Sequence, residues 1–369
     1  MIMMSEKLYL LILLIPYFFM GFVHDAFSQS KQTFTVVLDP GHGGKDPGAI
    51  GSMSKEKNIV LSVAKKLGDK INANHSDVKV LYTRSTDKFI PLDERPRIAN
   101  KAQAQLFISI HCNALDRRKR SPQGVETYIL GLHRSQDNLE VAKRENSVIV
   151  YEDNYETKYQ GFDPKEPESY IIFEFMSNKF LEQSLNFASL TQHELINGAK
   201  RTNRNVRQAG FLVLRETGMP SVLIELGYIS NRDEEKFMNS SQGQTALANS
   251  LYSAFSKYKA EYDKRNGYAA STRNNETPSV INNAFDTTDQ SSSSIEYKIQ
   301  FMISSRLYNA NAKAFKGLNS VEYYKDGHIY KYTYGSSTNE KDILLLLKTI
   351  KPKFKDAFIV EFKDGVRIK

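Results

Sequence analysis

Residues 33–263 alternate short apolar runs with segments of helical spacing, and this alternation limits the folds that the chain can adopt. Residues 34–38 form an apolar run that ends in Asp-Pro-Gly, which predicts a buried strand. Residues 55–72 then carry apolar side chains at helical spacing. Alternating elements of this kind predict an α/β fold with a mostly parallel twisted sheet and helices on both faces.

The same pattern continues to residue 263. We expect further strands at residues 78–83, 106–111, 124–130 (near an edge), 211–214 and 222–226, and helices at residues 92–103 and 242–262. Between residues 135 and 195 the alternation breaks, because residues 151–169 are polar and turn-rich and a helical pattern resumes only at about Tyr170. Long loops inside compact domains are usually functional or disordered. We therefore interpret residues 135–195 as an insertion that could cover one edge of the sheet.

The first 28 residues have the pattern of a secretory signal peptide. Lys7 precedes the apolar run 8–23, and small residues follow at Ala26 and Ser28. An uncleaved anchor is the alternative, but a membrane span takes about 20 residues, and the run is near the lower limit of that length. Cys112 is the only cysteine, so no internal disulfide can form, and strand alternation predicts a buried small residue there rather than a ligand.

The last hundred residues divide into a tether and a second domain. Residues 264–294 are rich in Asn, Ser and Thr, the composition of a flexible linker. Residues 295–369 follow the order strand, helix, strand, strand, helix, strand, with an Asp-Gly turn at residues 326–327. This order predicts a small α+β domain of the split βαβ, ferredoxin-like type. It holds no cluster of catalytic residue types, which favours a binding role.

Four side chains of metal-ligand or acid/base type lie where predicted strands end or a helix begins: His42, Glu56, His111 and Glu225. The carboxyl ends of parallel strands share one edge of an open sheet, and ligands bind there. Catalytic zinc sites use three protein ligands and leave a fourth position for water, whose pKa falls to about 7. His42, Glu56 and His111 can supply those ligands. Glu225 follows an apolar run, so we expect it to be a dry carboxylate that acts as a base.

Each of these four residues alone also has an ordinary structural explanation. A histidine at a strand end is usually a satisfied structural residue, and the turn around His42 could be an anion-binding nest. Glu56 could simply favour its helix N-terminus, and Glu225 could be a buried salt-bridge partner. Their shared position at one sheet edge, in segments far apart in the sequence, favours metal-dependent hydrolysis.

Several segments of the chain resemble the zinc-dependent N-acetylmuramoyl-L-alanine amidases, in that family's order, over about residues 33–263. They are VVLDPGHGGKDPGA, KEKNIVLSVAKKL, YTRSTDKFIPLDERPRIAN, LFISIHCNA and QAGFLVLRETGMPSVLIELGYISN. The resemblance implies zinc-dependent cleavage of the amide between N-acetylmuramic acid and L-alanine in peptidoglycan, in wall remodelling or daughter-cell separation. It also implies that His42, Glu56 and His111 hold Zn²⁺ and that Glu225 is the catalytic glutamate.

In the cell-division members of this family, an inserted helix blocks the zinc until a partner protein removes it. The insertion at residues 135–195 lies in the corresponding place, and its segment AKRENSVIVYED resembles the start of the family's insertion. The resemblance therefore implies an activator protein that displaces the insertion. Glu168 or Glu174 is the expected blocking carboxylate, and the spacing does not decide between them. A solvated loop with a supporting helix is the alternative.

The C-terminal domain is similar to the SPOR-type repeat that binds glycan strands of peptidoglycan lacking peptides. The similarity rests on YKIQFMIS, on the strand order and on attachment to an amidase-like domain. The side chains expected to contact sugars are Tyr297, Gln300, Tyr323, Tyr324, Tyr330 and Tyr332. Tyrosines that merely cover a solvated sheet face are the alternative.

Two other functions remain open from the sequence. One is a non-catalytic peptidoglycan-binding scaffold on an amidase fold, and the other is a zinc peptidase that cuts within the stem peptide. The net charge of +8 suits an acidic or polyanionic partner, and we expect no nucleic-acid partner. With the signal peptide removed we expect no stable membrane anchor, and a periplasmic location, with an extracellular one as the alternative.

Overall fold

The structure is a computed structural model that describes residues 33–267 and 295–368, apart from 116–121, 132, 134, 176–178, 305, 310–311, 327–328, 355–356 and 364. The expected signal peptide and most of the expected linker lie outside the described residues. None of the described helices is long and apolar enough to cross a membrane.

The larger part of the described chain is built on a six-stranded sheet in the order β2-β1-β3-β6-β4-β5. The strands are β1 (Phe34–Pro40), β2 (Val78–Tyr82), β3 (Leu106–Asn113), β4 (Val125–Leu130), β5 (Asn203–Ala209) and β6 (Ser221–Tyr228). β2, β1, β3 and β6 run parallel, whereas β4 is antiparallel to β6 and parallel to β5. The expected mostly parallel sheet is confirmed. β1, β3 and β6 are buried along their length, as apolar strands covered on both faces should be.

One strand expected from the sequence is wrong. Residues 211–214 were expected as a strand, but they belong largely to the short helix α8 (Leu212–Arg215). A short apolar run cannot by itself distinguish a buried strand from a buried helical turn. β4 lies one strand from the edge, and outside it lies β5, a polar strand that the sequence pattern did not reveal.

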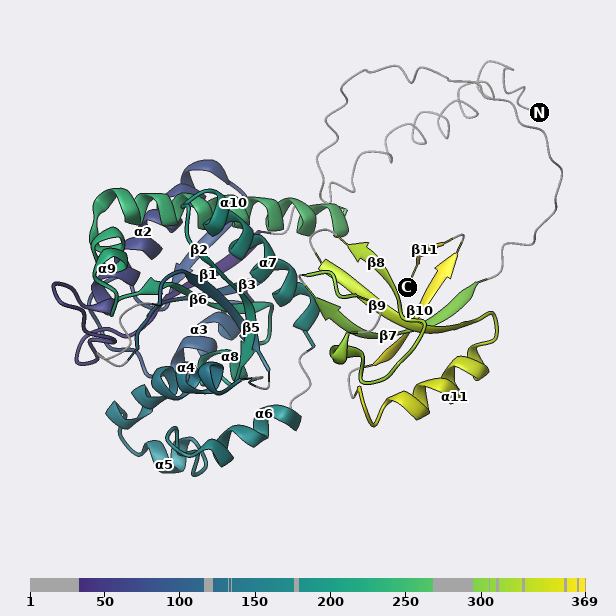
Figure 1. Ribbon diagram of the computed structural model, residues 1–369. Helices are drawn as coiled ribbons and strands as arrows, with labels where there is room; N and C mark the ends of the chain where they lie inside the picture. Colours follow the sequence, from purple (N-terminus) through teal and green to yellow (C-terminus); the bar gives the residue numbers. More distant parts are fainter. Residues whose placement is uncertain are drawn as a thin grey trace, which may run out of the picture. The chain divides into compact units, whose positions relative to one another are not determined.

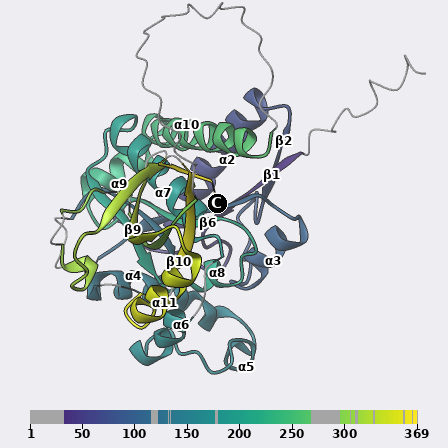
Figure 2. The same ribbon diagram turned by 90° about the vertical axis from the view of Figure 1, so that its right-hand side faces the viewer.

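Helices cover both faces of this sheet (Figure 1). On one face α2 (Glu56–Asn74), α7 (Leu181–Asn197), α9 (Arg232–Asn239) and α10 (Ser241–Arg265) contribute to one apolar core. On the other face α3 (Glu94–Lys101), α4 (Gln136–Asn146) and α8 contribute to a second core. Figure 2 shows α10 and α2 on one side of the sheet, and α8 and α4 on the other.

The segment expected as an insertion is mostly helical. After α4 come η1 (Ser147–Tyr151), α5 (Tyr155–Lys158), η2 (Pro167–Ile171) and α6 (Ile172–Phe175). α5 and α6 lie on the side of α4 that faces away from the sheet (Figure 1). The segment ends in α7, which packs on β4 and α10. α7 is therefore part of the layer that covers the sheet.

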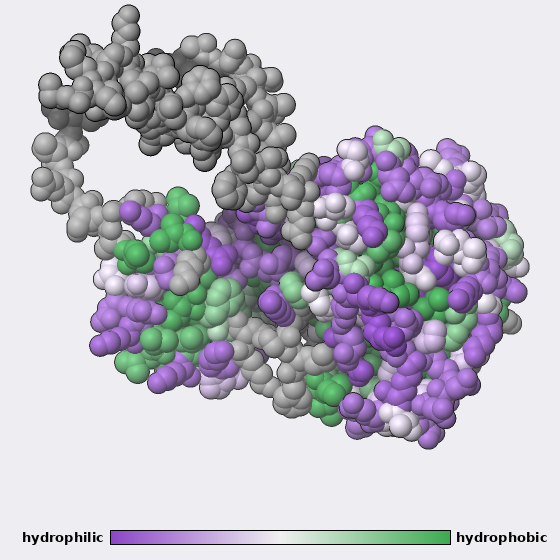
Figure 3. Space-filling model, turned by 180° about the vertical axis from the view of Figure 1, so that it is seen from behind, coloured by the Kyte–Doolittle hydropathy of each residue, from purple (hydrophilic) through white to green (hydrophobic). Residues whose placement is uncertain are grey.

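From residue 295 the chain forms a five-stranded antiparallel sheet in the order β11-β10-β7-β9-β8. Its elements are β7 (Glu296–Ser304), η3 (Lys313–Phe315), β8 (Glu322–Asp326), β9 (Ile329–Ser337), α11 (Glu340–Ile350), β10 (Phe358–Lys363) and β11 (Val366–Arg367). The expected order is present, with the first helix reduced to η3. α11 packs through Ile343 and Ile350, whereas Leu344 and Leu345 are exposed. Figure 3 shows hydrophobic residues at the surface of this part.

The six side chains expected to contact sugars do not share one face of this sheet. Tyr332 is buried and packs against Phe315 with the two rings tilted, and Tyr297 and Tyr330 pack beside the same core. Tyr324 instead donates a hydrogen bond to Gln300 Oε1 at 2.6 Å, and both residues lie on the opposite face by strand alternation. A single sugar-binding face therefore cannot include all six, because successive side chains of a strand point to opposite sides.

Candidate metal centre

The centre begins in the tight turn that follows β1. His42 has φ of 59°, in the left-handed region that few residues other than glycine adopt. Arginines hold the turn in this shape: Arg95 Nη2 donates to His42 O at 3.0 Å, and Arg84 Nη2 donates to Gly41 O at 2.7 Å. His42 Nδ1 lies 2.7 Å from Asp46 Oδ2. A carboxylate in this position keeps the proton on Nδ1 and leaves Nε2 free to bind a metal.

Glu56 is the first residue of α2, and its carboxylate points back under the turn. Its Oε2 accepts a hydrogen bond from Ala49 N at 2.8 Å, and its Oε1 accepts one from Cys112 N at 2.8 Å. Oε1 also lies 3.1 Å from His42 Nε2. The two backbone donors fix the carboxylate while leaving one oxygen directed at the histidine.

His111 lies near the end of β3, and its Nδ1 is 3.2 Å from Glu56 Oε1. A Cβ on Gly41 would come within 2.3 Å of the His111 ring, so the turn after β1 can pass over this ring only with glycine there. The neighbouring Cys112 is buried in the core on the opposite face, and its thiol is outside the group of possible ligands. The expectation of a small buried residue at Cys112 is confirmed.

A second carboxylate, from Glu145 on α4, is the fourth member of the group. The ligand atoms of His42, Glu56, His111 and Glu145 all lie within 4.8 Å of one another. His42 Nε2, His111 Nδ1 and Glu145 Oε2 are buried and make no hydrogen bond. Buried polar atoms are normally paired, so atoms that converge without protein donors fit a cation. Imidazole and carboxylate donors in this number suit zinc. This group could hold a metal ion.

Glu225 lies beside this group on the next strand. Its backbone is the register partner of His111 across β3 and β6, and its side chain is fully buried. Neither carboxylate oxygen has a hydrogen-bond partner among the residues that the structure describes. Burial, reinforced by the negative charge of Glu145, raises the pKa of Glu225 well above its usual value, although Arg144 opposes this rise. Such a carboxylate binds a proton readily, which is the property required of a general base.

We expected the blocking carboxylate to be Glu168 or Glu174, and for Glu168 this prediction is wrong. Glu168 is exposed in η2, and the side chain of Glu174 lies outside the described residues. Glu145 occupies the place instead, with Oε2 at 2.9 Å from His111 Nδ1 and 3.2 Å from His42 Nε2. The sequence pattern indicated the long polar loop, whereas Glu145 lies in the helix before that loop, among the buried residues of α4.

The neighbouring Arg144 ties α4 to the same strand edge. Its Nη1 donates to Ala114 O at 2.5 Å and its Nη2 to Asn113 Oδ1 at 3.1 Å. Nη2 also lies 3.7 Å from Glu225 Oε1. At the end of the helix, Asn146 Nδ2 donates to Gly210 O at 2.8 Å. α4 therefore places Glu145 against the ligand group and the preceding Arg144 against Glu225, and side-chain hydrogen bonds hold the helix there.

Another buried carboxylate, Glu235 of α9, shapes the loop between His42 and Glu56. It accepts hydrogen bonds from the backbone N–H groups of Ser52, Met53 and Ser54 at 2.7–2.9 Å and from the Ser54 hydroxyl at 2.8 Å. The sequence reasoning missed Glu235, Asp46 and Arg144. Only Asp46 left a usable signal, as an acidic residue four positions after a candidate ligand histidine.

Comparison with known proteins adds to this geometry. A model of the family described as N-acetylmuramoyl-L-alanine amidase matches residues 36–257. The N-acetylmuramoyl-L-alanine amidase AmiC of Escherichia coli O6:H1 is 32% identical over 232 residues, which cover 61% of this chain and 53% of AmiC. AmiA of Escherichia coli K12 is 32% identical over 237 residues, covering 63% of this chain and 79% of AmiA. The chain thus spans about half the length of the first relative and most of the second.

A solved structure resembles the same part of the chain. The crystal structure of the N-acetylmuramoyl-L-alanine amidase from Clostridium difficile 630 is 26% identical in sequence. It covers 62% of this chain and 97% of its own, with a TM-score of 0.46.

Proposed function

Because the chain belongs to the N-acetylmuramoyl-L-alanine amidase family, we propose that it hydrolyses the amide between N-acetylmuramic acid and L-alanine in peptidoglycan with the help of zinc. One observation carries the proposal: His42 Nε2 and His111 Nδ1, buried and without hydrogen-bond partners among the described residues, converge on Glu56 Oε1 beside a Glu225 carboxylate that is equally unpaired. The pairing of a metal-ligand set with a dry carboxylate is the minimum that metal-assisted amide hydrolysis requires.

In this proposal His42, Glu56 and His111 hold the zinc ion. When bound, the ion supplies Lewis acidity, which makes water a stronger acid and polarises a carbonyl group. Glu225 takes the proton from the attacking water and delivers it to the nitrogen of the leaving L-alanine. Asp46 keeps His42 in the ligating tautomer, and the arginines Arg84 and Arg95 hold the turn that carries it.

A zinc peptidase that cuts within the stem peptide would use the same groups, and a wall-binding scaffold would not need them. The match to the amidase family favours cleavage at the muramoyl amide over cleavage within the stem peptide. The scaffold is disfavoured because both oxygens of the buried Glu225 and Oε2 of the buried Glu145 lack hydrogen-bond partners among the described residues, and such buried atoms destabilise a fold that makes no use of them.

Removal of the metal is expected to stop hydrolysis. Dialysis against a chelator should abolish the release of soluble fragments from purified peptidoglycan, and one equivalent of zinc should restore it. His111→Ala should bind zinc with an affinity at least tenfold lower than that of the unaltered chain, because even groups that only support a ligand contribute about 10–100-fold in affinity. Atomic absorption measures the bound zinc, and the release of soluble fragments measures hydrolysis. Undiminished hydrolysis without any bound metal would rule the zinc role out.

We propose further that α4 keeps the resting enzyme closed. Three protein ligands leave a position open at a catalytic zinc ion, whereas four fill it, as in structural sites. Glu145 would supply the fourth, and Arg144 would occupy Glu225 from the same helix. The isolated enzyme then has a low rate, and full activity requires displacement of α4, which a partner protein that binds the insertion could bring about. The exposed apolar side chains of Val150, Ile171 and Ile172 on the insertion suit such a contact.

Export and wall binding complete the proposal. Residues 1–28 would direct the chain out of the cytoplasm and be removed, with the periplasm as the expected location and the extracellular space as the alternative. Residues 295–369 would act as a SPOR-like module that keeps the enzyme on glycan strands, joined by the linker at residues 264–294. Peptidoglycan metabolism in division or wall remodelling follows from these roles together.

A further inference from the structure

A cavity lies at the edge of the six-stranded sheet opposite the metal centre. Gln105 directly precedes β3 and Pro220 directly precedes β6, whereas His111 and Glu225 lie toward the other ends of the same strands. His111 is about 17 Å along β3 from Leu106, at roughly 3.3 Å per residue. The cavity is therefore separate from the catalytic groups. Its volume of about 390 Å³ falls within the roughly 300–1,000 Å³ of small-molecule sites.

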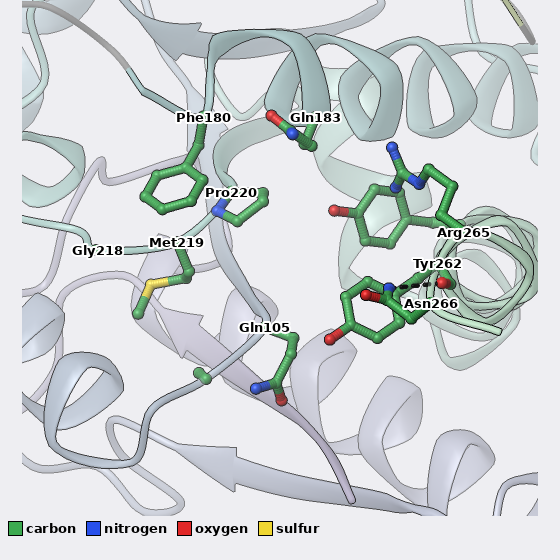
Figure 4. A pocket seen from close by; sticks show the side chains of 11 residues that line it. Gln105, Phe180, Gln183, Gly218, Met219, Pro220, Tyr262, Arg265 and Asn266 are labelled. Carbon is green, nitrogen blue, oxygen red and sulfur yellow. Dashed lines mark hydrogen bonds between the residues drawn. The ribbon is translucent and has the colours of Figure 1, made fainter. Parts of the chain in front are cut away.

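The walls of the cavity are apolar and face each other (Figure 4). Phe180, Met219 and Pro220 form one side, and the ring of Tyr262 from α10 lies on the other. Tyr258 of the same helix also lines the cavity. A flat ligand with apolar faces fits between two such walls, because rings and methylene groups bury area without demanding hydrogen bonds.

The polar groups of the cavity are amides and a cation. Gln183 Oε1 is buried and has no hydrogen-bond partner in the described part of the chain. An unpaired buried acceptor is costly unless a donor reaches it. The side chain of Gln105 already has hydrogen-bond partners in the protein, since its Oε1 accepts from Thr35 N and its Nε2 donates to Gln103 O. Arg265 borders the cavity, and no acidic side chain is among the described residues that line it.

We propose that this cavity binds an N-acetylmuramoyl sugar whose lactyl carboxylate is free. The acetamido N–H would donate to Gln183 Oε1, the carboxylate would accept from the Arg265 guanidinium, and the sugar ring would lie between Phe180 and Tyr262. The choice of ligand rests on the proposed function, because hydrolysis of the muramoyl amide leaves this carboxylate on the glycan. The enzyme would then hold its own product strand at a second site.

Methionine-methyl NMR of the full chain tests the proposal, with Met219 as the probe inside the cavity. Its signal is identified by its absence from Met219→Leu. Titration with N-acetylmuramic acid should move this signal, and N-acetylglucosamine, which lacks the lactyl carboxylate, should bind about tenfold more weakly, as the loss of one charge-assisted hydrogen bond predicts. Gln183→Leu should weaken the binding of both sugars.

Arg265→Gln should remove the preference between the two sugars, while Lys264→Gln, a neighbouring exposed lysine outside the cavity, should leave it intact. A Met219 signal that stays still at tens of millimolar sugar, or that moves equally for both sugars, overturns the proposal. So does a preference that survives Arg265→Gln. Fragment release from peptidoglycan is measured separately on the same variants, so a chain that binds the sugar but cleaves nothing refutes only the proposed function.

Discussion

Glu225→Gln is expected to lower the hydrolysis of purified peptidoglycan by roughly 10²–10⁴-fold, the usual contribution of a general acid–base. Glutamine has nearly the same shape as glutamate but cannot take a proton from water. Glu225 is fully buried and lies outside the group of ligand atoms, so the variant should keep its zinc and its fold. The measurement is the rate of soluble fragment release, with zinc content determined on the same sample.

Glu216→Gln is the matched control, because Glu216 is exposed and undergoes the same chemical change. It should retain the full rate. An unchanged rate in Glu225→Gln would show that the base lies elsewhere. Loss of zinc from the same variant would show that Glu225 helps to hold the metal, and the division of roles between the four residues would then be wrong.

Glu145→Ala is expected to raise the rate of the isolated enzyme by roughly tenfold or more, since hydrogen bonds and contacts to charged groups contribute about 1.5–3 kcal/mol. The substitution removes the fourth ligand atom while leaving alanine, which is favourable in a helix. Arg144 loses its contact with the Glu145 carboxylate, which further weakens the hold of α4 on the site. The rate is measured on purified peptidoglycan without any partner protein.

Glu140→Ala provides the comparison for that variant, because Glu140 lies on the same helix but is exposed. It changes charge and helix propensity in the same way and should leave the rate as it was. If Glu145→Ala were slower than the unaltered enzyme, Glu145 would be a working ligand. The closed resting state would then have to be abandoned.

The part of the site that lies on regular strands could be predicted, because the period of a strand and the shared edge of a parallel sheet fix where side chains go. His42, His111 and Glu225 lie in or directly after apolar runs, and such runs predict buried strands from the sequence alone. Glu56 follows from the helix that begins with it.

What could not be predicted depends on tertiary contacts. Glu145 is one of several acidic residues in the insertion, and only the docking of α4 distinguishes it. Residues 211–214 have the composition of a strand but turn as α8, where Leu212 N donates to Asn146 Oδ1 of α4 at 2.9 Å. β5 is polar and half exposed at the sheet edge, so its sequence lacks the alternation of apolar and polar residues that would predict a strand.

Mass spectrometry of the fragments released from purified peptidoglycan tests the central claim most directly. The account predicts stem peptides that begin with a free L-alanine amine, together with glycan strands that carry free lactyl carboxylates. Zinc should be required, and Glu225→Gln should release these same products roughly 10²–10⁴-fold more slowly. Peptides cut at any bond within the stem, with L-alanine still attached to the glycan, would contradict the account and identify the enzyme as a peptidase.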